Sequence, residues 1–123
     1  MLEEDYLMRM IHQMIHGLRR LLFKTQEETI ASFDAPAAEK YTLLLSMIDH
    51  GEINKAENYL FDQLDTQNLE ELRMALLFYE RLSQLSAQEL ARADFSAAEI
   101  QKGAEDILRI FGYDGLICWL DQA

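Results

Sequence analysis

The sequence is poor in residues that cross-link or break a chain. It has a single cysteine, Cys118, and a single proline, Pro36. One cysteine excludes a disulfide within the chain and favours a reducing compartment. β-Branched residues are scarce, and no stretch alternates apolar with polar residues as a half-buried strand would. Alanine, leucine, glutamate and glutamine dominate instead, and these residues favour helices.

Long apolar runs and positive charge are also lacking. The longest apolar run is about five residues, far below the roughly 20 that a membrane span needs. Three of the first five residues are acidic, whereas a signal peptide begins with basic residues. The net charge is −11, so the chain lacks the basic footprint of a nucleic-acid binder. We therefore expect a cytoplasmic protein without a membrane span or a nucleic-acid partner.

The common catalytic signatures are absent from the sequence, including a Gly-rich phosphate loop, a Cys-x-x-Cys pair and a nucleophile elbow. His12 and His16 lie four residues apart, as in zinc proteases, but Gln13 stands where the general-base glutamate is needed. Because an amide does not accept a proton at neutral pH, that reaction is excluded. Both histidines fall on the polar side of their helix, so we expect a surface pair. The alternative is a low-affinity metal site, with His50 as a third ligand.

These observations predict a protein that is not an enzyme and that holds no cofactor or metal. Half of the 123 residues are hydrophobic and 27% are charged, which is typical of one globular domain. Capping residues predict five or six helices that begin near residues 2, 34, 53, 68, 86 and 96. Gly51 and Gly112 are expected to end two of them. We therefore expect a single all-α domain over residues 1–123, and the apolar residues 116–120 are expected to form a last short helix that closes the core.

A helical hairpin is expected over residues 41–64. Gly51 falls at the turn between its helices, Ala56 at a small position of the second helix, and Leu60 at a large apolar position after it. This segment resembles one tetratricopeptide repeat, which implies antiparallel helical hairpins in a compact bundle. No second copy follows at a 34-residue period, so we expect a tetratricopeptide-like bundle and not a repeat array. The whole chain also resembles small helical proteins of unknown function in Gram-positive bacteria.

The N-terminal helix, predicted over residues 2–24, is strongly amphipathic. Its apolar residues fall within an arc of roughly 140° at 100° per residue. Residues 1–33 hold four basic and five acidic side chains, a net charge of −1, which leaves −10 for residues 34–123. Five apolar residues of this helix follow a spacing of four and three that is typical of a helix–helix seam: Leu7, Ile11, Met14, Leu18 and Leu21.

Three arrangements are open to this seam. It can pack on the chain's own core, form an interface with a second chain, or adsorb to a membrane surface, which the acidic charge disfavours. We expect a non-catalytic protein-interaction or adaptor domain that forms a homodimer or binds a protein partner through this helix. The alternative is a small-molecule- or metal-binding helical bundle, and a weaker alternative is an acidic mimic of DNA.

Overall fold

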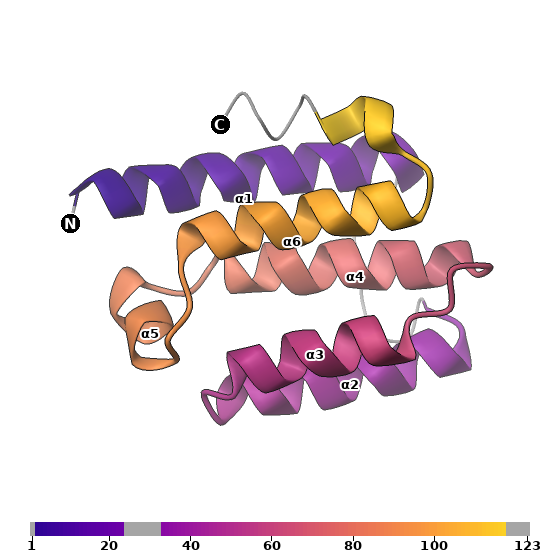
Figure 1. Cartoon of the computed structure of the whole chain (residues 1–123), viewed down its shortest axis with the longest axis horizontal. Helices are drawn as coiled ribbons and strands as arrows, with labels where there is room; N and C mark the ends of the chain where they lie inside the picture. The colour runs from indigo at the N-terminus through magenta and orange to yellow at the C-terminus, as the bar shows by residue number, and fades with distance from the viewer. Residues whose placement is uncertain (1, 24–32, 118–123) are drawn as a thin grey trace.

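The computed structural model describes residues 2–23 and 33–117, which form six α-helices and one short 3-10 helix (Figure 1). No strand occurs among these residues, and the predicted all-α class is confirmed. The first helix is described as far as Phe23, and residue 24, its predicted end, lies outside the described residues. The elements are α1 (Leu2–Phe23), α2 (Ala35–Asp49), α3 (Ile53–Gln63), α4 (Leu69–Leu82), α5 (Ala87–Arg92), α6 (Ala97–Ile110) and η2 (Asp114–Leu116).

Capping residues set the helix ends largely as the sequence predicts. The side chains of Asp34, Ser86 and Ser96 each accept a hydrogen bond from the backbone N–H three residues further along. This bond satisfies one of the N–H groups that the first turn of a helix leaves unpaired. Gly51 and Gly112 follow α2 and α6 with φ of 74° and 85°, a backbone conformation that glycine adopts without strain.

The start of α4 differs from the prediction in one respect. Asn68 caps the helix by accepting the N–H of Glu70 at 3.0 Å. The Glu71 carboxylate was expected to complete a capping box with Asn68. It instead accepts the backbone N–H of Asp65 at 2.9 Å and the Lys40 ammonium at 2.7 Å. Glu71 is fully buried, and a buried carboxylate is stable only where its charge is paired and its oxygens accept hydrogen bonds.

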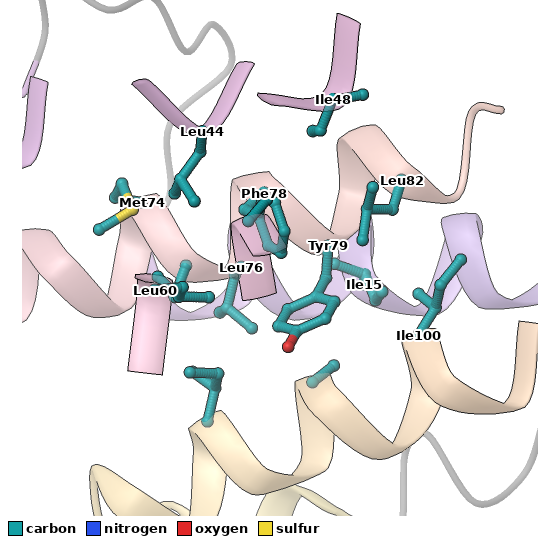
Figure 2. Packing of buried hydrophobic residues seen from close by; sticks show 14 of the residues in the cluster. Ile15, Leu44, Ile48, Leu60, Met74, Leu76, Phe78, Tyr79, Leu82 and Ile100 are labelled. Atoms are coloured by element: carbon teal, nitrogen blue, oxygen red, sulfur yellow. The ribbon is translucent and has the colours of Figure 1, made fainter. Parts of the chain in front are cut away.

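The central element is α4, which packs against α1, α6 and α2 (Figure 1). Ten of its fourteen residues are buried, so this helix has almost no solvent face. The hairpin of α2 and α3 lies on the side of α4 away from α1. Figure 2 shows Phe78 and Tyr79 of α4 in the middle of the core, with Leu44 of α2 on one side and Ile100 of α6 on the other.

The end of the described chain agrees only in part with the predicted closing helix. A 3-10 turn, η2, packs against α6 and includes Leu116, the first residue of that segment, and Ile117 after it is α-helical. Leu116 and Ile117 are half-buried against the core, as expected of an apolar end segment. The rest of the predicted helix, residues 118–120, lies outside the described residues.

The Tyr79 side chain extends from α4 into the space between α3 and α6. Its hydroxyl donates a hydrogen bond to Glu57 of α3 at 2.6 Å. A methyl group added at Gly103 of α6 would overlap the Tyr79 ring and hydroxyl, so a glycine here lets α6 lie directly on the ring. Burial raises the pKa of Tyr79 well above its usual value, which keeps the hydroxyl protonated as a donor.

We expect Gly103→Ala to lower the free energy of unfolding by roughly 1–3 kcal/mol, because the added methyl displaces Tyr79 and strains its packing. Urea denaturation followed by circular dichroism measures the change. Gly17→Ala is the matched control, because a methyl at this second helix-interior glycine meets nothing within 4 Å. That variant should raise the stability of the monomer by about 0.5–1 kcal/mol. Equal effects at both positions would contradict the role assigned to Tyr79.

Candidate functional site

The first helix covers the side of the bundle formed by α4 and α6 (Figure 1). Its inner face buries four apolar side chains, which are Met8, Ile11, Ile15 and Leu18. Ile11, Ile15 and Leu18 are fully shielded from solvent. A fully buried side chain of this size contributes about 1.5–3 kcal/mol, so this face alone is sufficient to hold α1 on the bundle.

The five residues predicted as an interface fall on two different surfaces. Ile11 and Leu18 belong to the inner face and contact the chain's own core. Leu7 and Met14 are half-buried at the edge of that core, and Leu21 is 49% exposed. The two fully buried members cannot meet a second chain without opening the bundle. The interface itself stays a prediction for Leu7, Met14 and Leu21.

A row of residues that is distinct from the inner face runs along the outer edge of α1, and we name it the outer stripe. Its members follow a spacing of three and four and are at least partly open to solvent: Leu7, Met10, Met14, Gly17 and Leu21. Tyr6, beside its first member, is 62% exposed. Met10 and Leu21 are not part of the core cluster or of the residues packed against it. Hydropathy alone misses Gly17, which carries no apolar side chain to count.

Gly17 has no packing role in the described part of the chain. A Cβ atom built on it meets nothing within 4 Å. A glycine inside a helix lowers stability by about 0.5–1 kcal/mol relative to alanine. Gly103 offsets that cost through its contact with Tyr79, whereas Gly17 has no comparable contact. A bare backbone site on an outward helix edge is where another element can approach closely.

The other edge of α1 is polar and is fastened to α4 by a buried ion pair. The Arg19 guanidinium donates two hydrogen bonds to the Glu80 carboxylate, at 2.8 and 3.2 Å, and both side chains are less than 10% exposed. Burial alone raises the pKa of Glu80, but the hydrogen bonds and charges of Arg19 and His16 outweigh it, so the pKa lies below its usual value. Glu80 is therefore ionised at neutral pH.

Both histidines of α1 lie on this polar edge, and each bonds to α4 through its Nδ1 atom. His12 Nδ1 is 3.0 Å from Ser83 Oγ, and His16 Nδ1 is 3.1 Å from Glu80 Oε2. The prediction of a surface pair thus holds only in part, since both histidines are half-buried, with 41% of the His16 side chain exposed. Their rings are stacked, with centroids 6.2 Å apart and planes inclined by 15°.

The hydrogen-bond partners favour the Nδ1–H tautomer of each histidine. The Ser83 hydroxyl donates to the backbone carbonyl of Glu80, so Ser83 Oγ accepts a hydrogen bond from His12 Nδ1. Ionised Glu80 can only accept, so His16 Nδ1 also carries its proton. The Arg19 Nη2 atom, which donates to Glu80, also lies 3.2 Å from His16 Nδ1. A histidine that activates a serine must accept the serine proton, so His12 and Ser83 do not form a nucleophile–base pair.

Other chemistry is sparse in the described residues. They contain no group of three or more histidine, cysteine, aspartate and glutamate side chains that could hold a metal ion, and His50 does not join the pair on α1. A hollow of about 380 Å³ lies between α3 and α6, with Glu57, Glu99, Lys102 and Asp106 among its lining residues. Burial is the largest cause of the raised pKa of Glu57. The negative charges of Glu99 and Asp106 raise this pKa further. This lining carries more acidic than basic side chains, and it includes no serine, threonine, cysteine or histidine.

Sequence comparison places the chain in a protein family. Residues 1–112 match the model of a family of unknown function, DUF6483, and the chain belongs to that family. No curated protein and no solved structure matches it. The resemblance to an uncharacterised family is thereby confirmed, while the tetratricopeptide-like character and the Gram-positive source stay predictions. No helix within residues 2–23 and 33–117 combines the length and the apolar character that crossing a membrane requires.

Replacing Arg19 with methionine should lower the free energy of unfolding by about 3–5 kcal/mol, because Glu80 is left buried without its cation. The double variant Arg19→Met with Glu80→Met should recover most of that loss, since no unpaired charge remains. Urea denaturation measures both. Arg20→Met, an exposed neighbour, should change stability by less than about 0.5 kcal/mol. A single variant as stable as the native chain would mean that the ion pair is not structural.

The same ion pair predicts a loss of stability in acid. Glu80 has a lower pKa folded than its ordinary value of 4.5, so below that pH the unfolded chain binds more protons. The stability that ionised Glu80 contributes is complete above pH 4.5, and it disappears as the pH falls through the pKa of Glu80 in the folded chain. Melting temperatures measured from neutral pH downward should fall more steeply for the native chain than for the Arg19→Met, Glu80→Met double variant. Parallel pH profiles of the two chains would contradict this assignment.

Proposed function

We propose that this chain is a non-catalytic helical interaction domain that forms a homodimer through the outer stripe of α1. The observation that carries the proposal is the stripe itself, a row of apolar residues with a bare glycine, on a helix whose segment, residues 1–33, carries a net charge of only −1. The inner face of α1 already holds the helix on its own bundle, so the stripe is available for a second chain.

The spacing of the outer stripe suits an antiparallel pair of α1 helices. Positions 7, 10, 14, 17 and 21 alternate steps of three and four, the rhythm of a helix–helix seam. In an antiparallel pair centred on Met14, Leu7 of one chain lies beside Leu21 of the other. Met10 then faces position 18 of the other chain, next to Gly17. Such a contact is the same on both chains, as a twofold interface requires.

Gly17 supports this pairing because its missing side chain leaves a hole in the stripe. Met10 is long and unbranched, so it fills irregular gaps easily. A methionine from a second chain seated over Gly17 would account for a glycine that nothing in the described part of this chain requires.

Charge supports the antiparallel direction. Three of the first four residues in the sequence of α1 are acidic, and its last turn carries Arg20. An antiparallel pair brings the acidic start of each helix next to the basic end of the other, which is favourable, whereas a parallel pair would place like charges together. The net charge of −10 on residues 34–123 would oppose a contact made elsewhere on the surface.

The hairpin of α2 and α3 is the second element of the proposal. Gly51 forms its turn, and Ala56 and Leu60 of α3 are buried in the core; these are the residues on which the tetratricopeptide resemblance rests. We include a tetratricopeptide-like adaptor role on this basis, with α1 as the self-associating element and the hairpin as part of the scaffold.

The test is the oligomeric state of full-length chains that carry one added charge. Sedimentation velocity at tens of micromolar protein should find the native chain dimeric and both Leu21→Glu and Met10→Glu monomeric, because each places a carboxylate in the seam. Gln13→Glu makes a comparable change at an exposed position of α1 outside the stripe, and it should stay dimeric. All three should keep the native circular dichroism spectrum.

Two further results decide the proposal. Gly17→Ala should stabilise the monomer yet weaken the dimer, because the methyl fills the gap that Met10 needs. The proposal is contradicted if the native chain is strictly monomeric at these concentrations. It is also contradicted if Gln13→Glu alone loses the dimer.

A further inference from the structure

We propose that His12 and His16 form a binding site for a divalent transition-metal ion, with the two Nε2 atoms as ligands and with Ser83 and Glu80 orienting the rings. The site lies on the polar edge of α1, away from the outer stripe, and it does not depend on dimer formation. A zinc, nickel or copper ion is the ligand class, because imidazole nitrogen suits these ions.

The hydrogen bonds that the two histidines make with Ser83 and Glu80 orient both rings for a metal. A metal-binding histidine usually donates its other ring N–H to an oxygen acceptor, which fixes the tautomer and makes the ligating nitrogen more basic. Here both protons lie on Nδ1, held by Ser83 Oγ at 3.0 Å and by Glu80 Oε2 at 3.1 Å. The lone pairs are consequently on the two Nε2 atoms, on the side of each ring away from its α4 partner.

The spacing and exposure of the rings allow both nitrogens to reach one ion. The histidines are one helical turn apart, and their nearly parallel rings have centroids separated by 6.2 Å. Because a metal–nitrogen bond is about 2.0–2.1 Å long, the rings must tilt slightly toward each other on binding. His16 is 41% exposed although its Nδ1 is bonded, so its outer edge is open to solvent and to the ion.

The charges around the pair set the strength of the site. The Glu80 carboxylate neutralises Arg19, the cation nearest to His16. Arg9 and Arg20 lie exposed at either end of the pair and oppose a cation, although water and salt screen them. With two protein ligands, the remaining positions on the ion are left to water. The site is therefore a surface chelate of moderate affinity.

Calorimetric titration of Zn²⁺ into the full-length chain tests the proposal. We expect one ion per chain, with the affinity lowered at least about tenfold by His12→Gln and equally by His16→Gln, because either change leaves a single ligand. His50→Gln is the matched control, since His50 is an exposed histidine elsewhere on the bundle, and it should leave the affinity unchanged. Melting curves without zinc show whether each variant is folded.

A fourth variant tests the orienting role separately from ligation. Ser83→Ala keeps both histidines but removes the acceptor of the His12 proton, and it should weaken zinc binding about tenfold. The proposal is overturned if the native chain releases or absorbs no heat, if His50→Gln removes the binding, or if either histidine of α1 can be replaced without loss of affinity.

Discussion

The burial of charged residues on α4 is the constraint on which the rest of the structure depends. This helix is covered by neighbours on three sides, so its charges cannot be solvated by water. A buried charge is tolerated only with a partner, and removing one partner is strongly destabilising. Two of the three buried charges pair with other helices, Glu71 with Lys40 of α2 and Glu80 with Arg19 of α1. The third, Arg73, pairs with Glu70 of α4 itself at 3.2 Å and lies over the ring of Phe33, just before α2, at 4.7 Å. The pairing selects which helix lies against which side of α4.

Local signals in the sequence were enough for the helices but not for this arrangement. Capping residues such as Ser86 and Ser96 act within four residues, so their effect can be read without knowing the fold. The charges of α4 follow the spacing of an ordinary solvated face, and nothing nearby marks them as buried. Glu71 shows the limit, because the predicted local cap competes with Lys40, which is 31 positions away. Pairing over such a distance depends on how the helices pack.

The candidate site, like the fold, could be predicted from the sequence only in part. The apolar residues of α1 fit two registers, one through Ile11 and Leu18 and one through Met10 and Gly17, and periodicity cannot choose between them. Contact with α4 and α6 distinguishes the two registers, because it buries the first and leaves the second at least partly open to solvent. The histidine pair was visible from its spacing, but its orienting partners Ser83 and Glu80 lie 71 and 64 positions away and could not be inferred.

The position of α1 has a consequence for the order of folding. The α2–α3 hairpin closes over a turn at Gly51, so it can form as soon as its own residues are made. The first helix leaves the ribosome earliest, yet its hydrogen-bonding partners on α4 are 61 to 71 residues further along, and α6 follows later still. Contacts of such long separation form slowly. The inner face of α1, with Ile11, Ile15 and Leu18, therefore stays uncovered during synthesis until α4 and α6 have emerged.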